Sequence, residues 1–199
     1  MADSDRRDWD DRIAFYREFG CDIAAEREFF VEKSRPLTGD ILEIGTGRGY
    51  LTAALAREDL NIITVDNSRV SQERAKEAIK NLGLEERVDF RLESAENLPF
   101  GDGRFDMIVS ANTLHHLDRP LAALRELSRV IKSGGKIVLS DFTKEGFDLV
   151  ARIHQAMGQR HTAGRFTIKD AFQYLRSRGF SLRSYRGRYQ ELIVARRGR

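Results

Sequence analysis

The chain has 199 residues, of which 41% are hydrophobic and 33% charged, and its formal net charge is +3. This length suits one domain with a sizeable core, and the single cysteine, Cys21, excludes an internal disulfide or a thiolate metal cluster. The sequence has no apolar run near the roughly 18 residues that cross a bilayer and no apolar N-terminal leader, so we expect a cytoplasmic protein without a membrane partner.

The first segment predicts helices. Apolar residues between Trp9 and Lys33 recur at roughly helical spacing among many charges, which is typical of one or two amphipathic helices. Pro36 and Gly39 then interrupt the pattern. We therefore expect residues 1–36 to form an N-terminal helical cap.

Short apolar runs and helical patterns alternate through the middle of the chain. The runs have lengths that suit strands buried on both faces, and they are Asp40–Ile44, Asn61–Val65, Val88–Leu92, Phe105–Ser110 and Lys136–Ser140. The helical patterns between them are Tyr50–Arg57, Val70–Leu82 and Leu121–Ile131. Strands that alternate with crossover helices predict a parallel sheet with right-handed connections.

The rhythm changes after Asp141. Two helical stretches, Phe147–Met157 and Ile168–Arg178, precede two strand candidates, Phe180–Tyr185 and Tyr189–Ala195. A turn at Gly187 and Arg188 would make the last two strands an antiparallel hairpin. We expect one doubly wound, Rossmann-like α/β domain, divided into the cap (1–36), a core (37–142), a helical insertion (143–179) and a C-terminal hairpin (180–199).

Three glycines follow the first predicted strand and open a helix. Gly45, Gly47 and Gly49 allow a sharp turn and a close approach of the backbone to a ligand. The spacing is not that of a dinucleotide fingerprint, because residue 50 is Tyr50, and no Lys-Ser or Lys-Thr pair follows as in a P-loop. A tight turn without a ligand could use the same glycines.

An acid ends the second predicted strand. Asp66 at that point can accept hydrogen bonds from two vicinal ribose hydroxyls. It could instead cap the helix that begins near Arg69. Together, the glycine turn and this acid indicate a ligand that contains a nucleoside.

Five motifs in order carry a family resemblance. They are Glu43-Ile44-Gly45-Thr46-Gly47-Arg48-Gly49, then Asp66, then Ala95–Phe100, then Phe105-Asp106, and then Leu114-His115-His116-Leu117. The set resembles the class I S-adenosylmethionine-dependent methyltransferases, in the type 11-like, small-molecule branch that includes quinone-biosynthesis C-methyltransferases. The resemblance runs from about residue 41 to 142 and includes the turn at 129–136. It implies a seven-stranded sheet, mostly parallel, with an antiparallel strand in the C-terminal hairpin.

The resemblance also implies a cofactor, S-adenosyl-L-methionine, with S-adenosyl-L-homocysteine as its product. By position, Glu43 would lie near the amino end of the methionine part, above the glycines. Asp66 and Asn67 would meet the ribose, and Ala95 and Glu96 the adenine. The full set implied for the cofactor is Glu43, Gly45, Thr46, Gly47, Gly49, Asp66, Asn67, Ser94, Ala95, Glu96, Asn112 and Thr113. Ser94 stands where the family often has an Asp that binds the adenine amino group.

Transfer from a sulfonium is an in-line displacement, and a base helps where the acceptor must lose a proton. His115 and His116 follow the fourth predicted strand and are the candidate bases, although they could instead pack the start of the next helix. Candidate acceptor residues are Tyr16, Phe19, His154 and His161, and the aromatic ones could instead belong to the core. Two late histidines are too few for a metal site, so we expect no metal.

Three functions remain open. The first is methyl transfer to a small-molecule acceptor, favoured by a cap and an insertion that can enclose one. The second is an RNA or protein methyltransferase, because eight arginines and only one acid lie between Arg176 and Arg199; nucleic acid is thus a possible partner, although not the favoured one. The third is a non-catalytic, cofactor-binding scaffold, for which Ser94 is the only sign. The acceptor and the oligomeric state do not follow from the sequence.

Overall fold

The computed structural model describes residues 2–160, 162 and 164–198, with side chains from residue 9 onward. The helices are α1 (Ala2–Glu18), α2 (Ile23–Ser34), α3 (Tyr50–Ala56), α4 (Arg69–Asn81), α5 (Pro120–Val130), α6 (Lys144–Ala156) and α7 (Ile168–Ser177), with short 3-10 turns at Glu85–Arg87 and Leu114–His116. The strands are β1 (Ile41–Ile44), β2 (Ile62–Asp66), β3 (Val88–Leu92), β4 (Phe105–Ala111), β5 (Ile131–Phe142), β6 (Ser181–Arg186) and β7 (Gln190–Arg196).

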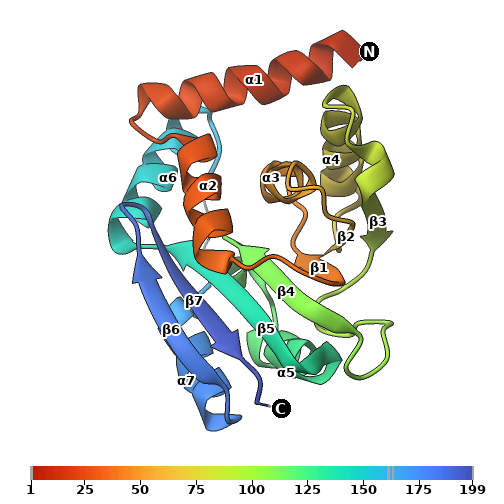
Figure 1. Cartoon of the computed structure of the whole chain (residues 1–199). Helices are drawn as coiled ribbons and strands as arrows, with labels where there is room; N and C mark the ends of the chain where they lie inside the picture. Colours follow the sequence, from red (N-terminus) through yellow and green to blue (C-terminus); the bar gives the residue numbers. More distant parts are fainter. Residues whose placement is uncertain (1, 161, 163, 199) are drawn as a thin grey trace.

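The strands form one seven-stranded sheet in the order β3-β2-β1-β4-β5-β7-β6 (Figure 1). The first five strands are parallel, and β7 pairs antiparallel with both β5 and β6. The doubly wound α/β class and the antiparallel hairpin predicted from the sequence are both confirmed. The sheet order reverses between β1 and β4, which is where ligands bind in open sheets of this type.

Helices cover both faces of the sheet because strand side chains alternate between the faces. On β4, Met107 and Val109 join a core with α2 and α3. Ile108, between them, joins the opposite core with α5 and α7. All three side chains are fully buried. This two-sided burial fixes the register of the central strands and, with it, the positions of the residues that follow them.

Two expectations about the strands need correction. Val88–Leu92 was expected to be buried on both faces, but β3 is the edge of the sheet, and Asp89 and Leu92 are exposed. The fifth strand was expected to begin at Lys136, but β5 begins at Ile131, which pairs with Phe105. The Gly134–Gly135 pair that suggests a turn lies inside this longer, irregular strand.

The predicted cap consists of α1 and α2. In Figure 1, α1 runs across one end of the molecule, above α2, α3 and α4, and it contacts α2 and α4. A small apolar cluster holds the cap to α6, with Cys21, Ile23, Leu149 and Ile153 buried in it. Among the described residues, no helix has the length and apolar character that a bilayer crossing requires.

Candidate functional site

A cavity of about 480 Å³ lies at the carboxyl ends of β1, β2 and β4. Its floor is the glycine turn after β1, and its other walls come from α1, α2, α6 and the segments that follow β2, β3 and β4. The volume falls within the range typical of small-molecule sites. Residues that are far apart in the sequence therefore meet around one space because their strands end at the same edge of the sheet.

The glycine turn has the backbone that its sequence requires. Gly45, Gly47 and Gly49 all have positive φ, at 82°, 54° and 80°, a region that favours glycine. A Cβ at Gly45 would overlap the Thr113 side chain, whereas a Cβ at Gly47 would meet no heavy atom within 4 Å. Gly45 and Gly47 line the cavity, and Gly49 instead caps the start of α3. The turn thus combines tight packing at Gly45 with open space at Gly47.

Asp66 is tied to this turn. One carboxylate oxygen accepts a hydrogen bond from the Gly47 backbone N–H at 2.9 Å, and the other accepts from the Ser68 N–H at 2.9 Å. A carboxylate has about four acceptor positions, so two remain for hydroxyl groups of a ligand. Asn67 lines the cavity beside it. Asp66 can therefore hold the glycine turn and accept hydrogen bonds from a ribose at the same time.

Glu43 is a buried acid at the end of β1. Its side chain is 1% exposed; Oε2 accepts from the Thr52 hydroxyl at 2.6 Å, and Oε1 has no hydrogen-bond partner among the described residues. Burial raises the pKa of Glu43 to about 7, against the opposing effects of the Thr52 and Thr64 hydroxyls and of Arg27. A buried acceptor without a partner is costly, so this atom indicates a place where a donor from a ligand belongs.

Arg27 on α2 supplies the opposite charge, and the sequence analysis missed it. It lines the cavity, and its Nε and Nη1 atoms are buried without a partner among the described residues. Burial lowers the pKa of its guanidinium, and the nearby carboxylates of Glu26 and then Glu43 partly offset this. Residues 26–28 on α2 are all charged, so the sequence does not indicate which of them line the cavity.

Thr46 supports the turn from below. Its hydroxyl shares a 2.7 Å hydrogen bond with the Thr64 hydroxyl and accepts a second from the Gln72 amide at 2.9 Å. The residue is 3% exposed, although it borders the cavity. Its side chain therefore joins β1, β2 and α4 beneath the turn.

The segment after β3 forms the wall expected to meet adenine. Ser94, Ala95 and Glu96 all line the cavity. The Ser94 hydroxyl accepts from the Glu96 N–H at 3.2 Å, and the Glu96 carboxylate accepts from the backbone and side chain of Arg119, both at 2.7 Å. These contacts hold the segment in place, and the Ser94 hydroxyl already takes part in its own turn.

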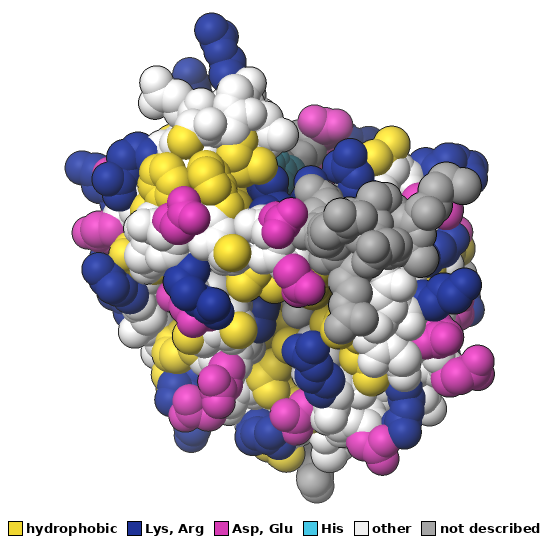
Figure 2. Space-filling model, turned by 90° about the horizontal axis from the view of Figure 1, so that it is seen from above, with side chains coloured by type: hydrophobic (Ala, Val, Ile, Leu, Met, Phe, Trp, Pro, Cys, Tyr) yellow, Lys and Arg dark blue, Asp and Glu magenta, His cyan; other side chains and the backbone are white. Residues whose placement is uncertain are grey.

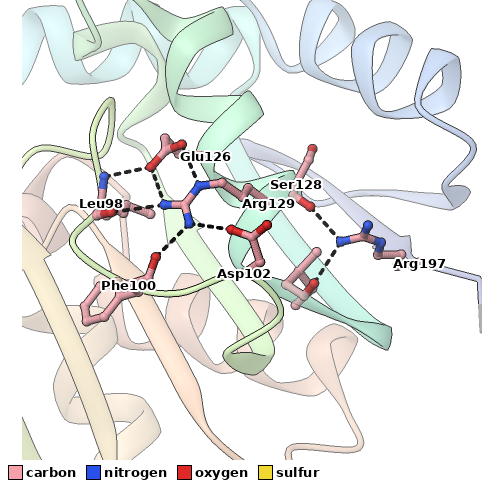
Figure 3. A network of polar contacts seen from close by, with 8 residues as sticks. Leu98, Phe100, Asp102, Glu126, Ser128, Arg129 and Arg197 are labelled. Carbon is pink, nitrogen blue, oxygen red and sulfur yellow. Dashed lines mark hydrogen bonds and ion pairs between the residues drawn. The ribbon is translucent and has the colours of Figure 1, made fainter.

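A polar network holds the continuation of this segment (Figure 3). Arg129 on α5 donates to the carbonyls of Leu98 and Phe100 at 3.0 and 2.7 Å and pairs with Asp102 and Glu126. Glu126 in turn accepts from the Leu98 N–H at 2.9 Å. The loop between β3 and β4 is therefore fastened at several points to α5.

Asn112, the first residue after β4, has an uncommon backbone conformation at the cavity wall. Asn112 has a φ of 56°, uncommon for a residue other than glycine, and its buried Oδ1 has no hydrogen-bond partner among the described residues. Thr113 donates to the Ala111 carbonyl at 3.2 Å. Both line the cavity. Backbone strain combined with an unpaired buried acceptor is typical of a binding site.

Both predicted histidines line the cavity, and they differ in environment. His115 is 3% exposed, and its Nδ1 lies 2.6 Å from the carboxylate of Asp141 at the end of β5. Desolvation and the neighbouring His115 lower the pKa of His116 to about 4. Asp141 also accepts from the His115 and Phe142 backbone N–H groups. The sequence analysis missed Asp141, although it follows a strand as Asp66 does.

The acceptor candidates are only partly brought together. The Tyr16 hydroxyl lies 3.2 Å from His154 Nε2, and both residues line the cavity. Phe19 does not line it and packs against Phe15, with ring centroids 5.2 Å apart. His161 lies outside the described residues. Arg12, which was not singled out from the sequence, joins Tyr16 and His154 at the cavity wall.

Known proteins match this chain in sequence and fold. Residues 42–139 match the family described as a methyltransferase domain. Methyltransferase GfsG of Streptomyces halstedii is 34% identical over 53% of this chain and 38% of its own length. The ubiquinone/menaquinone biosynthesis C-methyltransferase UbiE of Cronobacter sakazakii is 29% identical over 67% and 55%, respectively. The fold matches a protein of Methanococcus maripaludis with a TM-score of 0.74 and 22% identity, over 98% of this chain and 92% of that one.

The chain spans about half the length of these curated relatives. The matched segment contains the glycine turn, Asp66, the loop after β3 and the two histidines, whereas the walls that come from α1, α2 and α6 lie outside it. The family match, the fold and the ordered motifs together show that residues 42–139 form a methyltransferase domain of the class I, S-adenosylmethionine-dependent family.

Proposed function

We propose that this chain transfers a methyl group from S-adenosylmethionine to a small-molecule acceptor. One observation carries the proposal: beside the glycine turn, the cavity presents a carboxylate oxygen of Glu43 and guanidinium nitrogens of Arg27 that have no partner in the described part of the chain. The methionine end of the cofactor has an ammonium group and a carboxylate group. Each would satisfy one of these side chains, and Asp66 has acceptor positions left for the ribose.

The chain's own residues then have distinct tasks. When bound, S-adenosylmethionine supplies a sulfonium methyl group that a nucleophile of the acceptor can displace in line. Asp141 accepts the Nδ1 proton of His115, which leaves Nε2 as the nitrogen that can take a proton from the acceptor. The carboxylate also stabilises the imidazolium that would result. The glycine turn, Glu43 and Arg27 hold the donor side, so orientation supplies much of the rate.

A small acceptor agrees with how the cavity is covered. The cap and α6 form its outer wall, a position that suits an enclosed ligand better than a polymer. Figure 2 views the molecule from the α1 side, and acidic, basic and hydrophobic side chains are mixed over the described part of that face. Nucleic-acid sites instead have a continuous basic surface. The relative UbiE is a quinone-biosynthesis C-methyltransferase by name, which supports an acceptor of similar size.

A calorimetric titration tests the proposal. We expect the protein to bind S-adenosylmethionine and S-adenosylhomocysteine and to ignore a nicotinamide dinucleotide. Gly47→Ala should weaken both sulfur ligands at least tenfold, because its Cβ would enter the open space at the turn. Gly83→Ala is the matched control, since Gly83 also has a positive φ of 68° and open space around it, but lies outside the cavity.

The two glycine variants separate binding from backbone strain. Each should lose about 1 kcal/mol of unfolding free energy, because alanine is disfavoured at positive φ. Only Gly47→Ala should lose affinity. Equal affinity in all three proteins would remove the glycine turn from the binding site, and absence of binding in the wild type would refute the proposed function.

A further inference from the structure

Three side chains from two helices meet at the outer wall of the cavity. Arg12 and Tyr16 lie one helical turn apart on α1, and His154 lies on α6. Arg12 Nη2 is 3.0 Å from the Tyr16 hydroxyl and 3.4 Å from His154 Nε2, and the hydroxyl is 3.2 Å from the same nitrogen. All three residues line the cavity. We call this group the acceptor anchor.

Arg12 has no carboxylate partner among the side chains that the structure describes, which begin at residue 9. Its contacts are a phenol, an imidazole and the Met157 sulfur at 3.4 Å, and no carboxylate of the described side chains lies within ion-pair distance. Arg17, on the same helix, shows the usual arrangement, since it pairs with Asp22 and is exposed. A half-buried guanidinium at a cavity wall, with no carboxylate among its described contacts, suits an anionic ligand.

This charge lies on the acceptor side of the cavity. His154 is close enough to His116 to contribute to the lowering of its pKa, so the anchor adjoins the segment that contains the His115–Asp141 pair. The donor side has its own cation, Arg27, which adjoins Glu43 at the glycine turn. Arg48, which also lines the cavity, lies in the glycine turn and so belongs to the donor side as well. Among the described arginines that line the cavity, Arg12 is therefore the one on the acceptor side.

We propose that the methyl acceptor carries a carboxylate group and that Arg12, Tyr16 and His154 bind it. The planar fork of Arg12 matches the two oxygens of a carboxylate, and the Tyr16 hydroxyl and a His154 N–H can donate to the same group. The one permanent positive charge of the anchor, that of Arg12, suits a singly charged ligand. The inference rests on the proposed function, because it assigns the second substrate of the same site.

Matched acid and amide probes test the anchor. Benzoate, 3-phenylpropionate, indole-3-acetate and octanoate are compared with their amides by ligand-observed NMR on protein saturated with S-adenosylhomocysteine. We expect at least one acid to bind tenfold more tightly than its amide. Arg12→Gln should abolish this preference, and Arg12→Lys, which keeps the charge without the fork, should retain part of it. Arg17→Gln is the control and should retain all of it.

The outcomes separate the two proposals. The affinity for S-adenosylhomocysteine should stay within twofold in every variant, because Arg12 is assigned to the acceptor side. A tenfold loss in Arg12→Gln would move this residue to the donor side and overturn the inference. So would equal affinities of acid and amide, or no binding of any acid. If the wild type bound no S-adenosylhomocysteine, the proposed function would fail. Binding of the acids and amides to the ligand-free protein would then still show whether Arg12, Tyr16 and His154 prefer a carboxylate.

Discussion

Two arginines in this molecule have opposite surroundings. Arg129, on α5, donates to two backbone carbonyls and pairs with two carboxylates, in the network of Figure 3. Arg27, on α2, has two buried guanidinium nitrogens with no partner among the described residues. Arg27 lines the cavity, whereas Arg129 lies outside it, beside Asp102 in the loop before β4. The first arginine is satisfied by the protein, and the second is left for a ligand.

The difference separates residues that build the site from residues that bind. A satisfied network fixes the loop between β3 and β4, whose first residues form the cavity wall that is proposed to meet adenine. A buried charge without hydrogen-bond partners lowers the stability of the ligand-free protein. A ligand that pairs with this charge stabilises the protein again on binding. Mutations in the two places should therefore act on different quantities, namely folding at Arg129 and affinity at Arg27.

The largest expected effect is on folding. Arg129→Met should lower the free energy of unfolding by about 3 kcal/mol, at roughly 1 kcal/mol for each of the two carbonyl hydrogen bonds and for the partly exposed ion pairs together. Denaturant unfolding measures it. Arg125→Met, an exposed position on the same helix, is the control and should stay within about 0.5 kcal/mol of wild type. If the unfolding free energy of Arg129→Met also stayed within about 0.5 kcal/mol of wild type, the network would not stabilise the fold.

The second expected effect is on affinity and not on stability. Arg27→Met should weaken S-adenosylhomocysteine by about 2 kcal/mol, roughly thirtyfold, because a charged hydrogen bond to the ligand carboxylate is lost. Its free energy of unfolding should be unchanged or higher, since a buried charge without partners disappears. Calorimetry and denaturant unfolding on the same preparation give both values. A variant that loses stability and keeps its affinity would place Arg27 among the structural residues.

The positions of several site residues were predictable because strand ends meet at one edge of a parallel sheet. Glu43 is the last but one residue of β1 and Asp66 is the last of β2, and the structure places both at the cavity. Asp141 offers the same signal at the end of β5, but its meaning depends on His115, 26 residues earlier, which approaches it only in the folded chain. The edge position of β3 also depends on the strand order, which local patterns do not contain.

Helical residues were harder to assign. Arg12 and Arg27 lie among other charged residues on α1 and α2, so their side chains read as part of a solvated face. Which of them turns inward depends on how the cap packs against α4 and α6, a set of contacts between distant parts of the chain. Phe19 shows the converse, since an aromatic residue near the cavity packs against Phe15 instead.

The smallest expected effect is a pH dependence of cofactor affinity, and it concerns Glu43, the acid beside Arg27. Burial raises the pKa of Glu43 to about 7, so below pH 7 the side chain takes up a proton and attracts an ammonium group less. The affinity for S-adenosylhomocysteine should therefore fall as the pH is lowered from 7.5 to 6.0, by about eightfold at most for a group with this pKa, and level off above pH 7.5.

Glu43→Gln isolates this titration from the others in the cavity. The variant is neutral at every pH, so its affinity should be low and flat, while any contribution of His115 or His154 would persist in both proteins. His116 does not interfere, because its pKa of about 4 lies below this range. Titrations at four pH values between 6.0 and 7.5 measure the difference. If wild type and variant had parallel profiles, Glu43 would not bind the ammonium group, and Arg27 would be acting without it.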